Sequence, residues 1–128
     1  MTNSGRPRAA LAAALLMPCF LALAGCRAYL VRTTVVNRTG AVVNLLEVDY
    51  PSASFGVDSM APGAQYHQRL QFRDQGPLTV AYTGAQRHQY TVTGPTLYEK
   101  QQGSLEIDLL PGGKVEFHAH LTPPPSNQ

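Results

Sequence analysis

The sequence predicts an all-β domain, a seven- to eight-stranded antiparallel sandwich, over residues 29–122. Apolar and polar side chains alternate in short runs, which is the pattern of strands with one buried face. Turn-forming Gly, Pro, Asn and Asp residues separate these runs about every 8–12 residues, a spacing typical of sandwiches. No run in this range has the apolar periodicity of a helix of ordinary length.

The first half of the domain contains four predicted strands. Residues rich in β-branched side chains fill the first, and period-two alternation marks the second and the fourth. The third is a short edge strand. In chain order these strands cover residues 29–37, 41–50, 54–58 and 64–72, with turns at Asn37–Gly40 and Pro62–Gly63.

The second half continues with four more strands. The first two form a hairpin across a turn at residues 84–87, and Gly94-Pro95 opens a longer loop that runs to Gly103 and has room for one helical turn. The strands are marked by the alternating residues Leu78, Val80 and Tyr82, then Tyr90 and Val92, then Leu105, Ile107 and Leu109, and finally Val115, Phe117, Ala119 and Leu121.

The strand spacing and the Pro-Gly turns resemble the immunoglobulin-like domains of bacterial surface proteins. The chain has no Trp, so it lacks a hallmark of true immunoglobulin domains. A transthyretin-like sandwich fits the same spacing. Residues 123–128, which begin with three prolines, are predicted to be a disordered tail.

The N-terminus has the layout of a secretory signal peptide. Arg6 and Arg8 supply the positive charge, and an apolar run covers residues 9–24. The run is shorter than the ~20 residues that a transmembrane helix needs, and Pro18 weakens it as a helix. Two arginines ahead of an uncharged run at the chain start also argue against a buried core helix.

The run ends in Leu23, Ala24, Gly25 and Cys26, which resemble the lipobox of bacterial lipoproteins. The resemblance implies that Cys26 carries a diacylglyceryl group and becomes the first residue after cleavage. Cys19 fits poorly, because bulky residues precede it. The predicted order is therefore signal peptide (1–25), lipid anchor and short tether (26–28), sandwich domain (29–122) and tail (123–128).

The resemblance also implies a location in the cell envelope. Two or more acyl chains, such as palmitate, anchor a protein stably, so the partner at Cys26 is the membrane itself. In Gram-negative lipoproteins an Asp after the cysteine retains the protein at the inner membrane. Arg27 stands there instead, which resembles the pattern of the periplasmic face of the outer membrane.

Cleavage would change the charge and thiol content of the chain. The sequence has ten Lys and Arg against eight Asp and Glu, and two of those arginines lie in the signal peptide. The remaining chain has balanced charges, which argues against a nucleic-acid partner. With Cys19 removed and Cys26 acylated, no thiol remains for a disulfide or for nucleophilic catalysis.

The best candidate for ligand chemistry is the pair His118 and His120. Residues two apart on a strand share a face, and Glu116 lies on the same face. A three-residue loop at 112–114 would place Asp108 opposite His118 and Glu106 opposite His120. Imidazole with carboxylate suits Zn²⁺ or Cu²⁺. The alternative is the solvated face of an edge hairpin.

The sequence contains none of the common catalytic motifs, such as a Gly-x-Ser-x-Gly elbow, a P-loop or a His-Glu-x-x-His helix. We therefore expect neither an enzyme nor a bound cofactor. The predicted function is that of a lipid-anchored accessory or binding module that contacts another envelope protein. The alternative is a periplasmic metal-binding lipoprotein that uses the face of His118 and His120.

Overall fold

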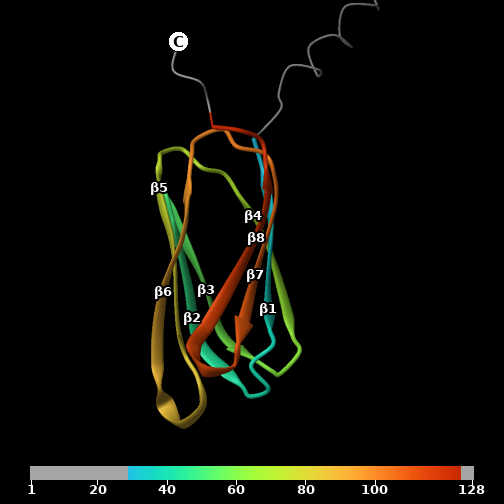
Figure 1. Ribbon diagram of the computed structural model, residues 1–128, viewed down its shortest axis with the longest axis vertical. Coiled ribbons are helices and arrows are strands. Elements are labelled where there is room, and N and C mark those ends of the chain that lie inside the picture. Colours follow the sequence, from blue (N-terminus) through green and yellow to red (C-terminus); the bar gives the residue numbers. More distant parts are fainter. Residues whose placement is uncertain (1–28, 125–128) are drawn as a thin grey trace, which may run out of the picture.

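The computed structural model describes residues 29–124, which form two four-stranded sheets packed face to face (Figure 1). Sheet A has the order β4-β1-β7-β8, and sheet B has the order β3-β2-β5-β6. The predicted all-β sandwich is confirmed. The strands are β1 (Val31–Asn37), β2 (Val43–Tyr50), β3 (Ala53–Met60), β4 (Gln65–Leu70), β5 (Gly76–Thr83), β6 (Gln89–Leu97), β7 (Gly103–Leu110) and β8 (Lys114–Leu121).

Several predictions fall on residues that the structure does not describe. The signal peptide, the lipobox with Cys26 and the short tether all precede residue 29, and the predicted tail is described only to residue 124. Within residues 29–124, the helical segments are two short 3₁₀ turns, Ala85–Arg87 and Pro111–Gly113. None of the helices in this range has the length and apolar character needed to cross a membrane.

The core lies between the sheets and is built by alternation along the strands. In β1 the buried side chains of Val31 and Val35 alternate with outward Arg32 and Thr34. The same alternation puts Leu105 and Ile107 of β7 inside. Such a continuous apolar layer stabilises a sandwich by removing its surface from water. The remaining buried apolar residues of the core are Val43, Leu46, Val48, Met60, Leu70, Phe72, Leu78, Val80, Tyr82, Leu97 and Leu109.

One pairing differs from the predicted antiparallel pattern, because β1 runs parallel to β7. The register places Val31 beside Gly103 and Val35 beside Ile107. A parallel pair cannot be closed by a hairpin and needs a long crossover connection. Here the connection includes all of sheet B. Alternation within β1 or β7 indicates which face of the strand is buried, but it does not indicate which strand lies beside it, so the sequence did not predict this pairing.

The strands of the first half differ from their predicted bounds by one or two residues at an end, and two predicted segments differ in a further respect. β3 is an edge strand of sheet B, as predicted, but it runs for eight residues. β6 continues through Gly94 and Pro95, where a loop was predicted. Pro is tolerated because β6 is also an edge strand, with one side unpaired in sheet B. At Gly94 a Cβ atom would lie 2.7 Å from the Phe117 ring, so glycine lets β6 pass close to β8.

Asn37 ends β1 with a side chain that is fully buried. Its Nδ2 atom lies 2.8, 3.0 and 3.1 Å from the carbonyl oxygens of Ala41, Met60 and Ala61. Its Oδ1 atom accepts hydrogen bonds from the backbone amide and the hydroxyl group of Thr39. This one side chain therefore fixes the β1–β2 loop against the end of β3, and it confirms the predicted turn at Asn37–Gly40.

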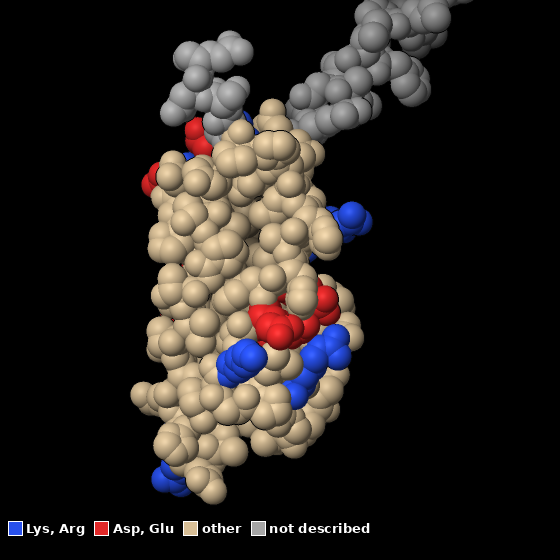
Figure 2. All heavy atoms as spheres, in the orientation of Figure 1, with Lys and Arg blue, Asp and Glu red and all other residues tan. Residues whose placement is uncertain are grey.

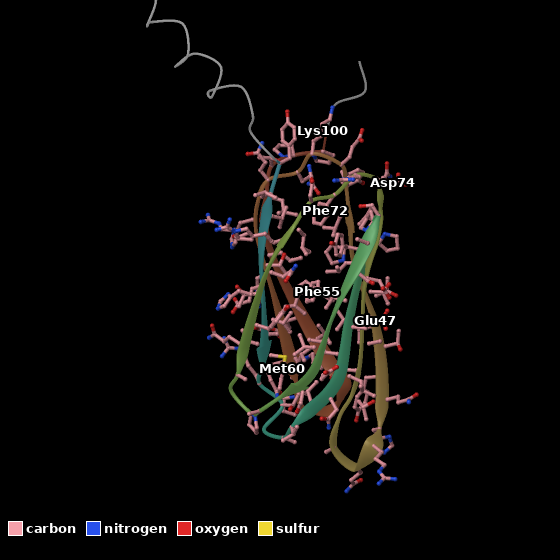
Figure 3. The ribbon with its side chains drawn as sticks, turned by 180° about the vertical axis from the view of Figure 1, so that it is seen from behind. Glu47, Phe55, Met60, Phe72, Asp74 and Lys100 are labelled. Atoms are coloured by element: carbon pink, nitrogen blue, oxygen red, sulfur yellow. The ribbon has the colours of Figure 1, made fainter. Side chains whose placement is uncertain are left out.

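The loops divide between the two ends of the sandwich. The described chain enters and leaves at one end, where Figure 3 also places Asp74 and Lys100. We call this the proximal end. The β1–β2, β3–β4, β5–β6 and β7–β8 connections lie at the opposite, distal end, toward which Met60 lies.

Replacing Asn37 by Ala should lower the free energy of unfolding by about 2–4 kcal/mol, because several buried polar groups lose their partners at once. Urea unfolding followed by circular dichroism measures the loss. Asn44→Ala is the matched control, since Asn44 is exposed on β2 and should change stability by no more than about 0.5 kcal/mol. Equal losses in the two variants would contradict the role assigned to Asn37.

Candidate functional site

A compact cluster of charged side chains lies on the outer face of sheet A, over β7 and β8 (Figure 2). It contains Glu106 and Asp108 from β7, Glu116 and His118 from β8, and Arg38, which directly follows β1. Three adjacent strands therefore supply the cluster, and the parallel register of β1 and β7 brings Arg38 to it.

The predicted register of the β7–β8 hairpin is wrong. Asp108 lies opposite Glu116, Glu106 lies opposite His118, and His120 lies opposite Ser104. The turn occupies Pro111–Gly113 rather than residues 112–114, and this moves every partner by two residues. Proline has no amide hydrogen to give to the ladder, so β7 ends before it.

Asp108 is the centre of the cluster and is only 6% exposed. Arg38 Nε lies 3.3 Å from its Oδ1 atom, and His118 Nε2 lies 3.3 Å from its Oδ2 atom. Oδ1 has no hydrogen bond of good geometry within residues 29–124, so charge attraction from Arg38 is its main compensation. These neighbours cover Asp108, whereas the alternative of a solvated hairpin face still describes His118 and Glu116, whose side chains are 48% and 49% exposed.

His118 lies between two carboxylates. Its Nε2 atom is 3.3 Å from Asp108 and 3.5 Å from Glu116, and its side chain is 48% exposed. One ligand atom from each of these three residues lies within 4.8 Å of the others. Ligand atoms of one tetrahedral zinc ion are separated by about 3.4 Å, since each lies about 2.1 Å from the metal. The donor set and its spacing therefore fit a divalent ion.

The sequence-predicted ligands divide between this cluster and its surroundings. His118 and Asp108 come together as predicted. Glu106 instead faces Arg38 at 3.6 Å, and His120 lies farther along β8 toward the proximal end. Glu116 completes the set, and its place on the same strand face as His118 was the signal for it.

His120 lines an open hollow of about 360 Å³ on the same face of sheet A, and His118 of the cluster lies at its wall as well. Arg32, Thr34 and Glu106 also line it, together with His67. The Nδ1 atom of His67 lies 3.0 Å from the Thr34 hydroxyl group, so this imidazole is engaged by its neighbour strand. The hollow is wide and open, and we assign the candidate site to the tighter cluster around Asp108.

The fold and the cluster define the chain as an all-β sandwich with a charged site on one sheet. No protein-family model and no curated protein sequence matches it. Among solved structures, it is similar to a protein from Eubacterium rectale determined by NMR, with a TM-score of 0.52 and 14% sequence identity. The match covers 70% of this chain and 87% of that one. At this identity the similarity concerns the fold alone.

Replacing Arg38 by Ala should lower the free energy of unfolding by about 1–2 kcal/mol at neutral pH. The change leaves the buried Asp108 carboxylate short of positive charge, and the half-exposed position of Arg38 limits the loss. Chemical denaturation measures it. Adding Asp108→Asn should recover part of the loss, since a neutral amide needs no countercharge.

The matched control is Arg69→Ala. Arg69 is exposed on β4, on the same outer face, and makes no ion pair within residues 29–124. It should change stability by about 0.5 kcal/mol at most. A loss as large as that of Arg38→Ala would mean that general surface charge, and not the contact with Asp108, is responsible.

Proposed function

We propose that this chain is a lipid-anchored module of the cell envelope that acts by contact with another envelope protein. The lipobox-like residues Leu23, Ala24, Gly25 and Cys26 support the anchor. So does the start of β1 at Val31, because only residues 27–30 separate it from Cys26. The five peptide steps from Cys26 to Val31 span at most about 18 Å, and this short reach would hold the proximal end close to the lipid headgroups.

The observation that carries this proposal is a pair of exposed apolar side chains at the proximal end. Tyr29 is 40% exposed and Leu30 is 37% exposed, directly before β1. Tyr is favoured at membrane interfaces, where its ring meets the acyl boundary and its hydroxyl group meets water. The pair would add apolar contact to the lipid chains on Cys26.

The distal end carries the features that suit a protein partner. Val42 is 46% exposed and Leu45 is 67% exposed, and both lie where β2 begins. Leu45 sits at a β-bulge with φ of 52°, a left-handed conformation that costs a non-glycine residue about 1–2 kcal/mol. Bulges and such strain are over-represented at functional sites. A membrane-held module would therefore present Leu45 away from the bilayer.

Cys26→Ser tests the anchor in intact cells. The variant should lose incorporation of labelled palmitate and should move from the membrane fraction to the supernatant, because the hydroxyl group of Ser cannot replace the thiol in lipidation. Cys19→Ser is the matched control and should remain labelled and membrane-bound. A Cys26→Ser chain that is still labelled and still sediments with membranes would refute the proposal.

The cluster around Asp108 supports a second candidate function, divalent metal binding by the same module. The ligands would be Asp108, Glu116 and His118, and a water molecule would complete a tetrahedral shell around Zn²⁺. A bound cation would also supply positive charge to the buried carboxylate, which now depends on Arg38. Metal ligands bind in their deprotonated forms, so binding should weaken in acidic solution.

Thermal unfolding of the full chain with and without Zn²⁺ tests this site. At a free concentration about 100 times its Kd, Zn²⁺ should add about 2.7 kcal/mol to stability, and His118→Ala should abolish the gain. His120→Ala is the matched control and should keep the gain, because His120 lies outside the cluster. If Zn²⁺ leaves the melting temperature of the unsubstituted chain unchanged, the proposal of metal binding is refuted. Equal loss in both variants would refute this ligand set.

A further inference from the structure

A small crevice opens at the distal end of the sandwich, where three loops meet. Three groups of residues line it: Thr39 and Ala41 from the β1–β2 connection, Tyr82, Gly84, Ala85 and Tyr90 from the β5–β6 hairpin, and residues 110–113 from the β7–β8 turn. Its volume is about 100 Å³. It is separate from the charged cluster on the outer face of sheet A.

Aromatic rings and bare glycines shape this crevice. The rings of Tyr82 and Tyr90 lie 5.3 Å apart between centroids. Gly113 has φ of 77°, and a Cβ atom there would overlap the Tyr90 ring. At Gly84 a Cβ atom would lie 3.0 Å from the same ring. Glycine at both positions therefore lets the Tyr90 ring pack directly against the backbone.

Tyr82, one of the residues that line the crevice, carries a buried polar group. Tyr82 is 3% exposed, and its hydroxyl group makes no hydrogen bond within residues 29–124. Burial, and secondarily the proximity of Tyr90, raises the pKa of the Tyr82 phenol, so it remains a neutral donor and acceptor at physiological pH. A buried hydroxyl group without a partner is unfavourable, and a ligand atom that pairs with it would recover this loss.

The lining also determines the charge of a ligand. No Asp, Glu, Lys, Arg or His is among the described residues that form the walls. A charged ligand would lose its hydration there without gaining a countercharge. We propose that the distal crevice binds a small, uncharged ring compound with one hydroxyl or carbonyl oxygen, the ring against Tyr90 and the oxygen on the Tyr82 hydroxyl group. The proposal does not depend on the lipid anchor.

The size of the crevice agrees with this class of ligand. A closed, apolar cavity of about 150 Å³ is sufficient to bind benzene. The crevice is smaller but open on one side, so a single six-membered ring can enter without being fully enclosed. Aromatic walls add offset or edge-to-face contacts with such a ring.

Phenol and benzene are the matched probes, because they differ by one hydroxyl group. In ¹H–¹⁵N NMR spectra of the full chain, phenol should shift the amide signals of Tyr82, Tyr90 and Gly112 in a saturable way. Tyr82→Phe should raise the Kd for phenol about fivefold to tenfold and leave the Kd for benzene unchanged. The same variant should keep or raise the melting temperature, because it removes an unpaired buried hydroxyl group.

Ala41→Leu fills the crevice and should abolish the shifts from both probes. Ala53→Leu, at the proximal start of β3, adds the same side chain outside the crevice and should leave both Kd values unchanged. Absence of saturable shifts at these amides would overturn the proposal. An equal rise in the Kd values for phenol and benzene on Tyr82→Phe would overturn it as well. This second test does not need Ala41→Leu, so the proposal can still be refuted if that variant fails to fold.

Discussion

Sheet A depends on the parallel pairing of β1 with β7. β4 pairs with β1 and β8 pairs with β7, so among the described strands this pairing alone joins the two halves of the sheet. The inward side chains Val31 and Val35 of β1, and Leu105 and Ile107 of β7, are all essentially buried. Their burial provides the driving force that brings distant parts of the chain together. Because the pairing is non-local, its burial must also offset the entropic cost of closing a long loop.

Both candidate sites follow from that pairing. Arg38 continues directly from β1, and its amide donates to the carbonyl of Leu109 at 2.8 Å, which holds the chain beside Asp108. The next residue, Thr39, then reaches the crevice beside Leu110. Asn37 keeps this short segment in place through its buried side chain. The charged cluster and the crevice are therefore neighbours at one loop, although their chemistry differs.

Local alternation, β-branched residues and turn signals were together sufficient to predict seven to eight strands, because each strand has one buried face. It failed at Gly94 and Pro95, where turn-forming residues lie within β6 and only the edge position and the contact with Phe117 permit the strand to continue. For the charged site, the shared face of His118 and Glu116 was predictable from spacing. Arg38 was not, because its place depends on pairing with a strand far along the chain.

The proposed partner surface and the proposed metal site are compatible, because they lie on different sheets. The strands of sheet B contain no Lys, Arg or His, and they carry the exposed carboxylates Glu47, Asp49 and Asp58. Glu47 and Asp58 line the same open hollow as the exposed Leu45. A protein that docks there would therefore offer basic side chains around an apolar contact, since opposite charge assists association. The ligands of the proposed metal site face the other way, on sheet A, where the side chains of His118 and Glu116 are half-exposed and Asp108 is buried beneath its neighbours. Metal could thus exchange while the partner remains bound.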